Sequence, residues 1–194
     1  MVFVVLEGFS GTGKTTLTTG LEKMGWMRLP ESAHVVPEVV PVAERANTAS
    51  DYSLLGATML YSSVISQTRK SRKIVSEGYL LSDLAYAKVR YDLGKSDAFP
   101  TMLATCKSIL REESLRPDLY IILEAKASTI RRRQQRKNAR EKISVELFRT
   151  NYYSALEEIH RKVGEDKIAR VNIDSLRKPA LQAVLDVLKE RNVV

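Results

Sequence analysis

The stretch Gly8-Phe9-Ser10-Gly11-Thr12-Gly13-Lys14-Thr15 decides the fold of this chain, because it matches the phosphate-binding pattern GxxxxGK(S/T) at every fixed position. An apolar, β-branched run at 2–6 precedes it and is typical of a buried parallel strand. The residues that follow carry apolar side chains at the spacing of one helix face: Leu17, Leu21 and Met24. The sequence therefore predicts a strand, a glycine loop and a helix that Gly25 ends.

The loop also predicts where the phosphates of a nucleotide lie. Its glycines let backbone N–H groups surround an anion, and the helix that follows adds its N-terminus. We expect Lys14 to reach the β- and γ-phosphates and the Thr15 hydroxyl to bind Mg²⁺. A turn that merely joins a strand to a helix is the alternative interpretation. The residues expected to contact the nucleotide here are Gly8, Ser10, Gly11, Thr12, Gly13, Lys14, Thr15 and Thr16.

Length and composition indicate an ordinary globular domain. The chain has 194 residues, 44% of them apolar and 28% charged, without an internal repeat or linker, so we expect one domain over 1–194. No apolar run approaches the roughly 20 residues that span a bilayer, and the N-terminus lacks the basic region of a signal peptide. The single cysteine, Cys106, excludes an internal disulfide. We expect a cytoplasmic protein with no membrane partner.

The net charge of +8 favours anionic partners such as nucleotides or nucleic acid, although a basic surface can also serve solubility alone. Six Lys or Arg residues and no acid occupy the segment 131–140. On a helix, Arg132 and Arg136 share one face and suit bidentate contacts with phosphate. A solvated helix face is the alternative interpretation of this segment.

Strand and helix patterns alternate along the whole chain. Predicted strands occupy 2–6, 26–29, 74–76, 119–123 and 169–173. Helical patterns cover 54–65, 102–110, a basic segment that Ser128 caps, 145–159 and a helix that starts at Pro179. This alternation predicts an α/β fold with three αβα layers and a central parallel sheet of about five strands. In such sheets ligands bind beyond the carboxyl ends of the strands.

Acidic residues near these strand ends are candidates for chemistry. Glu77 is the best placed acid to hold Mg²⁺ together with Thr15, with a plain surface carboxylate as the alternative. An acceptor hydroxyl requires a nearby base, for which Glu31 is the first candidate and Glu38 the second. His160 follows the apolar stripe of a predicted helix and is interpreted as structural.

The order of these parts resembles the thymidylate kinase and deoxynucleoside kinase group of P-loop kinases, from Val2 to about Ile159. The run 4–8 together with 11–16 is similar to the opening of both branches. The segment 76–86 occupies the place of their acidic-arginine motif. Within and after it, Ala85-Tyr86 resembles thymidylate kinases, whereas 87–93 is closer to deoxynucleoside kinases.

The resemblance implies a P-loop NTPase fold, a basic lid at about 128–142 that carries Arg132 and Arg136, and a homodimer as the common assembly. It also implies that Glu31 is the general base and that Asp174 lies where these kinases hold adenine. Two positions depart from the family pattern. Gly78 replaces the arginine that contacts the acceptor, and Ser10 replaces the aspartate usual in thymidylate kinases.

The sequence therefore predicts an ATP- and Mg²⁺-dependent kinase that phosphorylates a nucleoside or nucleotide. Its predicted catalytic residues are Lys14, Glu31, Arg132 and Arg136. Two other interpretations stay open because the acceptor motif is altered. In one, the acceptor is a nucleotide within DNA or RNA, for example one with a hydroxymethylated base; in the other, the chain binds nucleotides without kinase activity.

Overall fold

A computed structural model describes residues 2–136, 144–163, 167–174 and 179–193. Five parallel strands form one sheet in the order β2-β3-β1-β4-β5. The strands are β1 (Phe3–Glu7), β2 (Met27–Leu29), β3 (Ile74–Glu77), β4 (Leu119–Glu124) and β5 (Ile168–Asn172). The helices are α1 (Lys14–Glu22), α2 (Thr48–Thr68), α3 (Leu80–Asp92), α4 (Phe99–Ile109), α5 (Ala127–Gln135), α6 (Val145–Val163) and α7 (Ala180–Glu190). Short 3₁₀ turns lie at Ser32–His34, Ala43–Arg45 and Glu113–Leu115.

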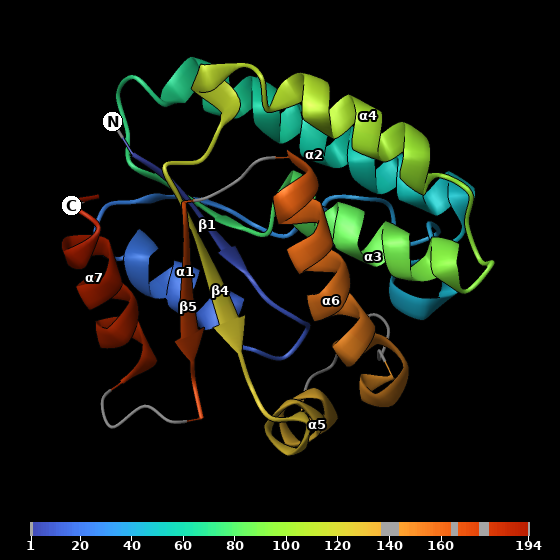
Figure 1. Cartoon of the computed structure of the whole chain (residues 1–194). Helices are drawn as coiled ribbons and strands as arrows, with labels where there is room; N and C mark the ends of the chain where they lie inside the picture. The colour runs from blue at the N-terminus through green and yellow to red at the C-terminus, as the bar shows by residue number, and fades with distance from the viewer. Residues whose placement is uncertain (1, 137–143, 164–166, 175–178, 194) are drawn as a thin grey trace.

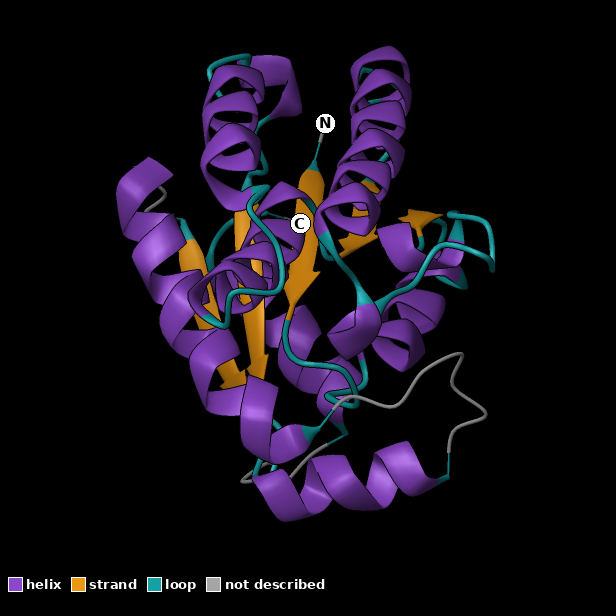
Figure 2. Cartoon of the chain, turned by 90° about the vertical axis from the view of Figure 1, so that its right-hand side faces the viewer, coloured by secondary structure: helices purple, strands orange, loops and turns teal. Residues whose placement is uncertain are grey.

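Helices cover both faces of the sheet, which confirms the predicted three-layer α/β fold (Figure 1). Successive side chains of a strand point to opposite faces. Thus Phe3 and Val5 join the core under α2, α3, α4 and α6, whereas Val4 and Leu6 join the core under α1 and α7. All strands point the same way, and α5 lies beyond their carboxyl ends in both views (Figures 1 and 2). The candidate site is expected at that edge.

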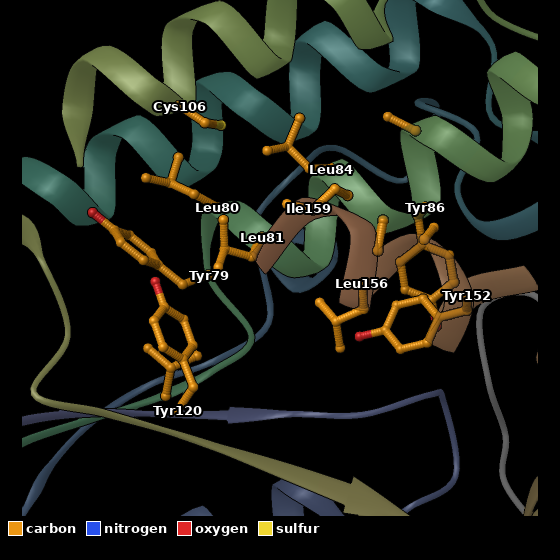
Figure 3. Close-up of a cluster of buried hydrophobic side chains, with 14 of the residues drawn as sticks. Tyr79, Leu80, Leu81, Leu84, Tyr86, Cys106, Tyr120, Tyr152, Leu156 and Ile159 are labelled. Carbon is orange, nitrogen blue, oxygen red and sulfur yellow. The ribbon is translucent and has the colours of Figure 1, made fainter. Parts of the chain in front are cut away.

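Helix α3 is an element that the sequence pattern does not predict. Its side chains are buried on nearly all sides, because it packs against α2, α4 and α6, so no single apolar stripe marks it. Figure 3 shows Leu81 and Leu84 of α3 beside Leu156 and Ile159 of α6. It also shows the ring of Tyr86 beside that of Tyr152. The acidic-arginine segment thus continues into the central helix of this layer.

Two local predictions are wrong. Helix α1 ends at Glu22, and Met24 is 55% exposed rather than part of the buried face. Ser128 lies inside α5 and does not cap it; the carboxylate of Asp174 instead accepts from the Lys126 backbone N–H and the Thr129 hydroxyl. Of the predicted basic lid at about 128–142, residues 137–142 lie outside the described residues. No described helix combines the length and apolar character needed to cross a bilayer.

A buried ion pair joins α3 to α2. The Arg90 guanidinium donates to both carboxylate oxygens of Asp51 and, at 3.0 Å, to the carbonyl of Ala43. The Arg90 side chain is 1% exposed and that of Asp51 is fully buried. Such a pair contributes little net stability compared with an apolar replacement, but loss of one partner leaves an uncompensated charge in the core.

We expect Arg90→Met to lower the free energy of unfolding by about 3–5 kcal/mol, because Asp51 loses its partner. Urea unfolding at equilibrium measures the change. The matched control is Arg170→Met, which removes a half-exposed arginine from Glu124 and Glu157 and is expected to cost less than about 1 kcal/mol. Equal losses in the two variants would contradict the role given to the buried pair.

Candidate functional site

The glycine loop connects the end of β1 to the start of α1 at the carboxyl edge of the sheet. Gly8 lies so close to β4 that a Cβ atom there would be 2.8 Å from the Leu123 carbonyl oxygen, at a φ of +147°. Within the loop, the Thr12 N–H and hydroxyl both donate to the Phe9 carbonyl, at 3.1 and 2.9 Å. Gly13, at a φ of +102°, leads directly into α1. The loop is therefore a fixed turn with a helix N-terminus at its mouth.

Side chains of helix α5 donate hydrogen bonds to the backbone carbonyls of the loop. Arg133 donates to the carbonyls of Gly11 and Thr12, at 3.3 and 2.9 Å, and Gln134 donates to that of Ser10 at 3.2 Å. The sequence pattern selects Arg132 and Arg136 from this segment, but both are exposed, and the arginine that contacts the loop is Arg133. Which arginine faces the loop depends on the rotation of α5 about its axis, and the sequence pattern alone does not define that rotation.

Two tyrosines also form hydrogen bonds with the loop. The Tyr86 hydroxyl of α3 accepts from the Ser10 N–H at 3.3 Å. The Tyr153 hydroxyl of α6 accepts from the Phe9 N–H at 3.4 Å and donates to the Leu123 carbonyl at 2.7 Å. The loop therefore makes polar contacts with three helices, and its position relative to the sheet is fixed before any ligand binds.

Lys14 and Glu31 meet at the mouth of the loop. The Lys14 ammonium donates to the Gly8 carbonyl at 2.7 Å and lies 3.9 Å from the Glu31 carboxylate. The Lys14 side chain is 5% exposed and that of Glu31 is 28% exposed. By contrast, Glu38 is exposed on the following loop, as is His34. Of the two candidate bases, Glu31 is therefore the one that the fold brings to the lysine.

Glu77 ends β3 and gathers donors from two neighbouring elements. Its carboxylate accepts from the hydroxyls of Thr15 and Thr18 of α1, at 2.7 and 2.9 Å, and from the Arg28 guanidinium of β2. Burial alone would raise the pKa of Glu77, but these hydrogen bonds and the charge of Arg28 outweigh it and lower the pKa. Glu77 is therefore a buried, ionised carboxylate directly beside Thr15.

The altered acceptor motif has a structural basis. Gly78 adopts a φ of +73°, and a Cβ atom there would be 3.1 Å from the Cβ of Ser82. An arginine at this position would be strained, because residues with side chains rarely adopt such angles. Arg28 of β2 directs its guanidinium at the neighbouring Glu77, with Nε 2.7 Å from the carboxylate. The sequence pattern does not identify Arg28 as a site residue. The only sign of its role in the sequence is that a charged residue stands within a short apolar strand.

Two buried acids behind the loop also escape sequence reasoning. Burial raises the pKa of Glu7 to about 8, against the opposing effects of Ser82 and Lys14. Burial likewise raises the pKa of Asp83 to about 7, although hydroxyls of α2 and of the turn after β2 donate to it. With a pKa of about 8, Glu7 is mostly protonated at neutral pH. Its position directly before the glycine loop is the only signal in the sequence.

Asp174, predicted to lie near adenine, follows β5 at the same edge. Burial opposes its ionisation, but the hydrogen bonds from Thr129 and from the Lys126 N–H lower its pKa. His160, predicted to be structural, is 3% exposed, and its ring lies perpendicular to that of Tyr120 with the ring centroids 5.0 Å apart. Burial lowers the pKa of His160 to about 4, so it is neutral in the core at neutral pH.

Comparison of the sequence with models of protein families finds no match, and comparison with curated proteins finds none either. Solved structures do match over nearly the whole chain. Deoxyadenosine kinase from M. mycoides with bound dATP has a TM-score of 0.74 and 19% identity, covering 97% of this chain and 100% of that one. The same enzyme with the products dCMP and dCDP has a TM-score of 0.67 and 19% identity, covering 97% and 99%.

Thymidylate kinase from Candida albicans gives a TM-score of 0.73 at 14% identity, covering 98% of this chain and 92% of that one. Both branches named by the sequence resemblance are therefore present among the structural neighbours. At these identities the likeness concerns the fold. This chain has the fold of the P-loop deoxynucleoside and thymidylate kinases.

Proposed function

We propose that this protein is an ATP- and Mg²⁺-dependent kinase that transfers the γ-phosphate to a nucleoside or nucleotide. The observation that carries the proposal is the convergence of Lys14, Glu31 and Glu77 on the mouth of the glycine loop. Phosphoryl transfer depends mainly on positioned phosphates and compensated charge, and these groups supply both. The fold shared with kinases of deoxyadenosine and thymidylate supports the same reaction class.

The donor side fits a magnesium–nucleotide complex. Mg²⁺ prefers oxygen ligands and few protein contacts, and the Thr15 hydroxyl with the ionised Glu77 carboxylate forms such a set. When bound, Mg²⁺ neutralises charge on the β- and γ-phosphates. The loop N–H groups and Lys14 would hold the same phosphates from the other side. Asp174 would lie near adenine, as the resemblance implies.

The acceptor side requires a base and cations. The Glu31 carboxylate would take the proton from the acceptor hydroxyl. The hydroxyl oxygen would then form a bond to the γ-phosphorus while the bond between that phosphorus and the β-phosphate oxygen breaks. The exposed residues Arg132 and Arg136 would contribute positive charge over the transferring group. A nucleotide within DNA or RNA is the second candidate acceptor, because the net charge is +8 and Gly78 replaces the arginine that family members direct at the acceptor. A homodimer and a cytoplasmic location also stay predictions.

We expect Lys14→Ala to lower turnover by about 10²–10³-fold or more, because the charge beside the β- and γ-phosphates is lost. Transfer of label from ATP to nucleosides, monophosphates and oligonucleotides, with plain and hydroxymethylated bases, measures it. Circular dichroism checks that the variant is folded. Undiminished transfer would refute a kinase that uses this loop, and ATP binding by the wild type without transfer to any acceptor would favour a non-catalytic module.

We expect Glu77→Gln to raise the Mg²⁺ concentration for half-maximal nucleotide binding by about tenfold, because a neutral amide is a weaker ligand than a carboxylate. Mg²⁺-dependent binding of a fluorescent ATP analogue measures this without turnover. Glu124→Gln is the matched control, since Glu124 ends the neighbouring strand β4 but pairs with Arg170 instead. A shift of the same size in both variants would argue against the metal role of Glu77.

Glu31→Gln is expected to lower kcat by about 10²–10⁴-fold, the usual contribution of a positioned general base, with little effect on the KM for ATP. Steady-state kinetics with the best acceptor from the panel measure both constants. The control is Glu38→Gln, which changes an exposed acid on the same loop and should leave kcat within about twofold. A larger loss in the Glu38 variant would reverse the choice of base.

A further inference from the structure

A basic hollow of about 610 Å³ lies at the edge of the sheet opposite the glycine loop. Its wall includes the residue directly before β4 and the residue directly before β5, so it faces the amino ends of the strands. Six of its ten lining residues are cationic: Arg69, Lys107, Arg111, Arg116, Lys162 and Lys167. Only Glu113 and Asp118 of this lining carry the opposite charge.

Arg69 builds the wall of this hollow. Its guanidinium donates to the carbonyls of Glu113, Ser114 and Arg116, at 3.0, 3.0 and 2.6 Å. It also donates to the carboxylate of Asp118 at 2.9 Å, and Asp118 in turn accepts from the Phe3 N–H at 2.7 Å. The turn between α4 and β4 is thereby held in one shape. The charges of Arg69 and Asp118 compensate each other, so neither is available to a ligand.

Lys162, a further cation of the hollow, pairs with Glu158 at 2.5 Å. By contrast, the side chains of Lys107, Arg111 and Lys167 form no hydrogen bond or ion pair with any part of the chain that the structure describes. They come from the end of α4, the turn after it and the start of β5, and they line one hollow. Like charges held around a hollow raise the local potential and attract anions.

We propose that this hollow binds an anion with closely spaced phosphate groups through Lys107, Arg111 and Lys167. An arginine fork and two ammonium groups are the donors that suit phosphate oxygens. Among the described residues that line the hollow, Leu110 and Pro117 are the only apolar ones, and none offers an aromatic ring on which a base could stack. The hollow therefore recognises the phosphates and not the base.

This site is separate from the reaction centre. Strand β4 has six residues, and at about 3.3 Å per residue it places the two edges of the sheet roughly 20 Å apart. One bound nucleotide cannot fill both sites with its phosphates. The phosphate groups can belong to a free polyphosphate or to the backbone of a nucleic acid, and the chemistry of the hollow is the same for both.

The test uses tripolyphosphate and the Lys14→Ala protein, in which the glycine loop has lost its lysine and binding there is weakened. Isothermal titration calorimetry should detect binding, and the double variant Lys107→Gln with Lys167→Gln should weaken it by about tenfold for each charge-assisted hydrogen bond removed. Lys95→Gln, on the exposed turn before α4 and outside the lining, is the control for net charge and should have no effect. Each change in the hollow is also made singly, and urea unfolding confirms that all variants are folded.

A single-stranded oligonucleotide titrated at several salt concentrations separates the two sources. Tighter binding of tripolyphosphate indicates a free polyphosphate. Tighter binding of the oligonucleotide indicates a nucleic acid backbone, and the salt slope should then fall by about 0.7 for each lysine removed from the hollow. The absence of tripolyphosphate binding, or equal weakening in the Lys95 control and the double variant, would overturn the proposal.

Discussion

The rest of the site depends on the hydrogen bonds that the Glu77 carboxylate accepts. It is buried at the end of β3, yet it stays ionised because Thr15, Thr18 and Arg28 direct hydrogen bonds at it. These donors belong to α1 and β2, so one charge fixes the first helix and the short edge strand against the sheet. The same charge stands beside the hydroxyl that the loop offers to a metal. Fold and donor site therefore share one electrostatic constraint.

Position 78, where the family resemblance implies an arginine, has a backbone conformation that residues with side chains rarely adopt. The guanidinium beside Glu77 belongs to Arg28 on the neighbouring strand. Behind the loop, Glu7 and Asp83 have pKa values raised by burial to about 8 and about 7. Because Glu7 carries a proton, the end of β1 places no additional buried charge beside the loop.

Much of the fold was predictable because its signals are local. The glycine motif, the apolar strands and the alternation of elements each occupy a few consecutive residues, and Lys14, Thr15 and Glu77 follow from them. Helix α3 was not predictable, since burial on all sides removes its periodicity. Contacts between distant residues were also beyond reach: Arg28 meets a carboxylate 49 positions away, and the choice of Arg133 over its neighbours depends on the rotation of α5.

Helix α5 donates side-chain hydrogen bonds to the glycine loop at the carbonyls of Ser10, Gly11 and Thr12, at 2.9–3.3 Å. A carbonyl is present whatever the side chain, so a replacement of Ser10 leaves the hydrogen bond from Gln134 available. Gly11 is different, because its φ is +97° and a Cβ atom there would be 3.4 Å from Ile130 of α5. Helix α5 is thus docked by contacts that leave the side chain free at Ser10 and require glycine at the next position.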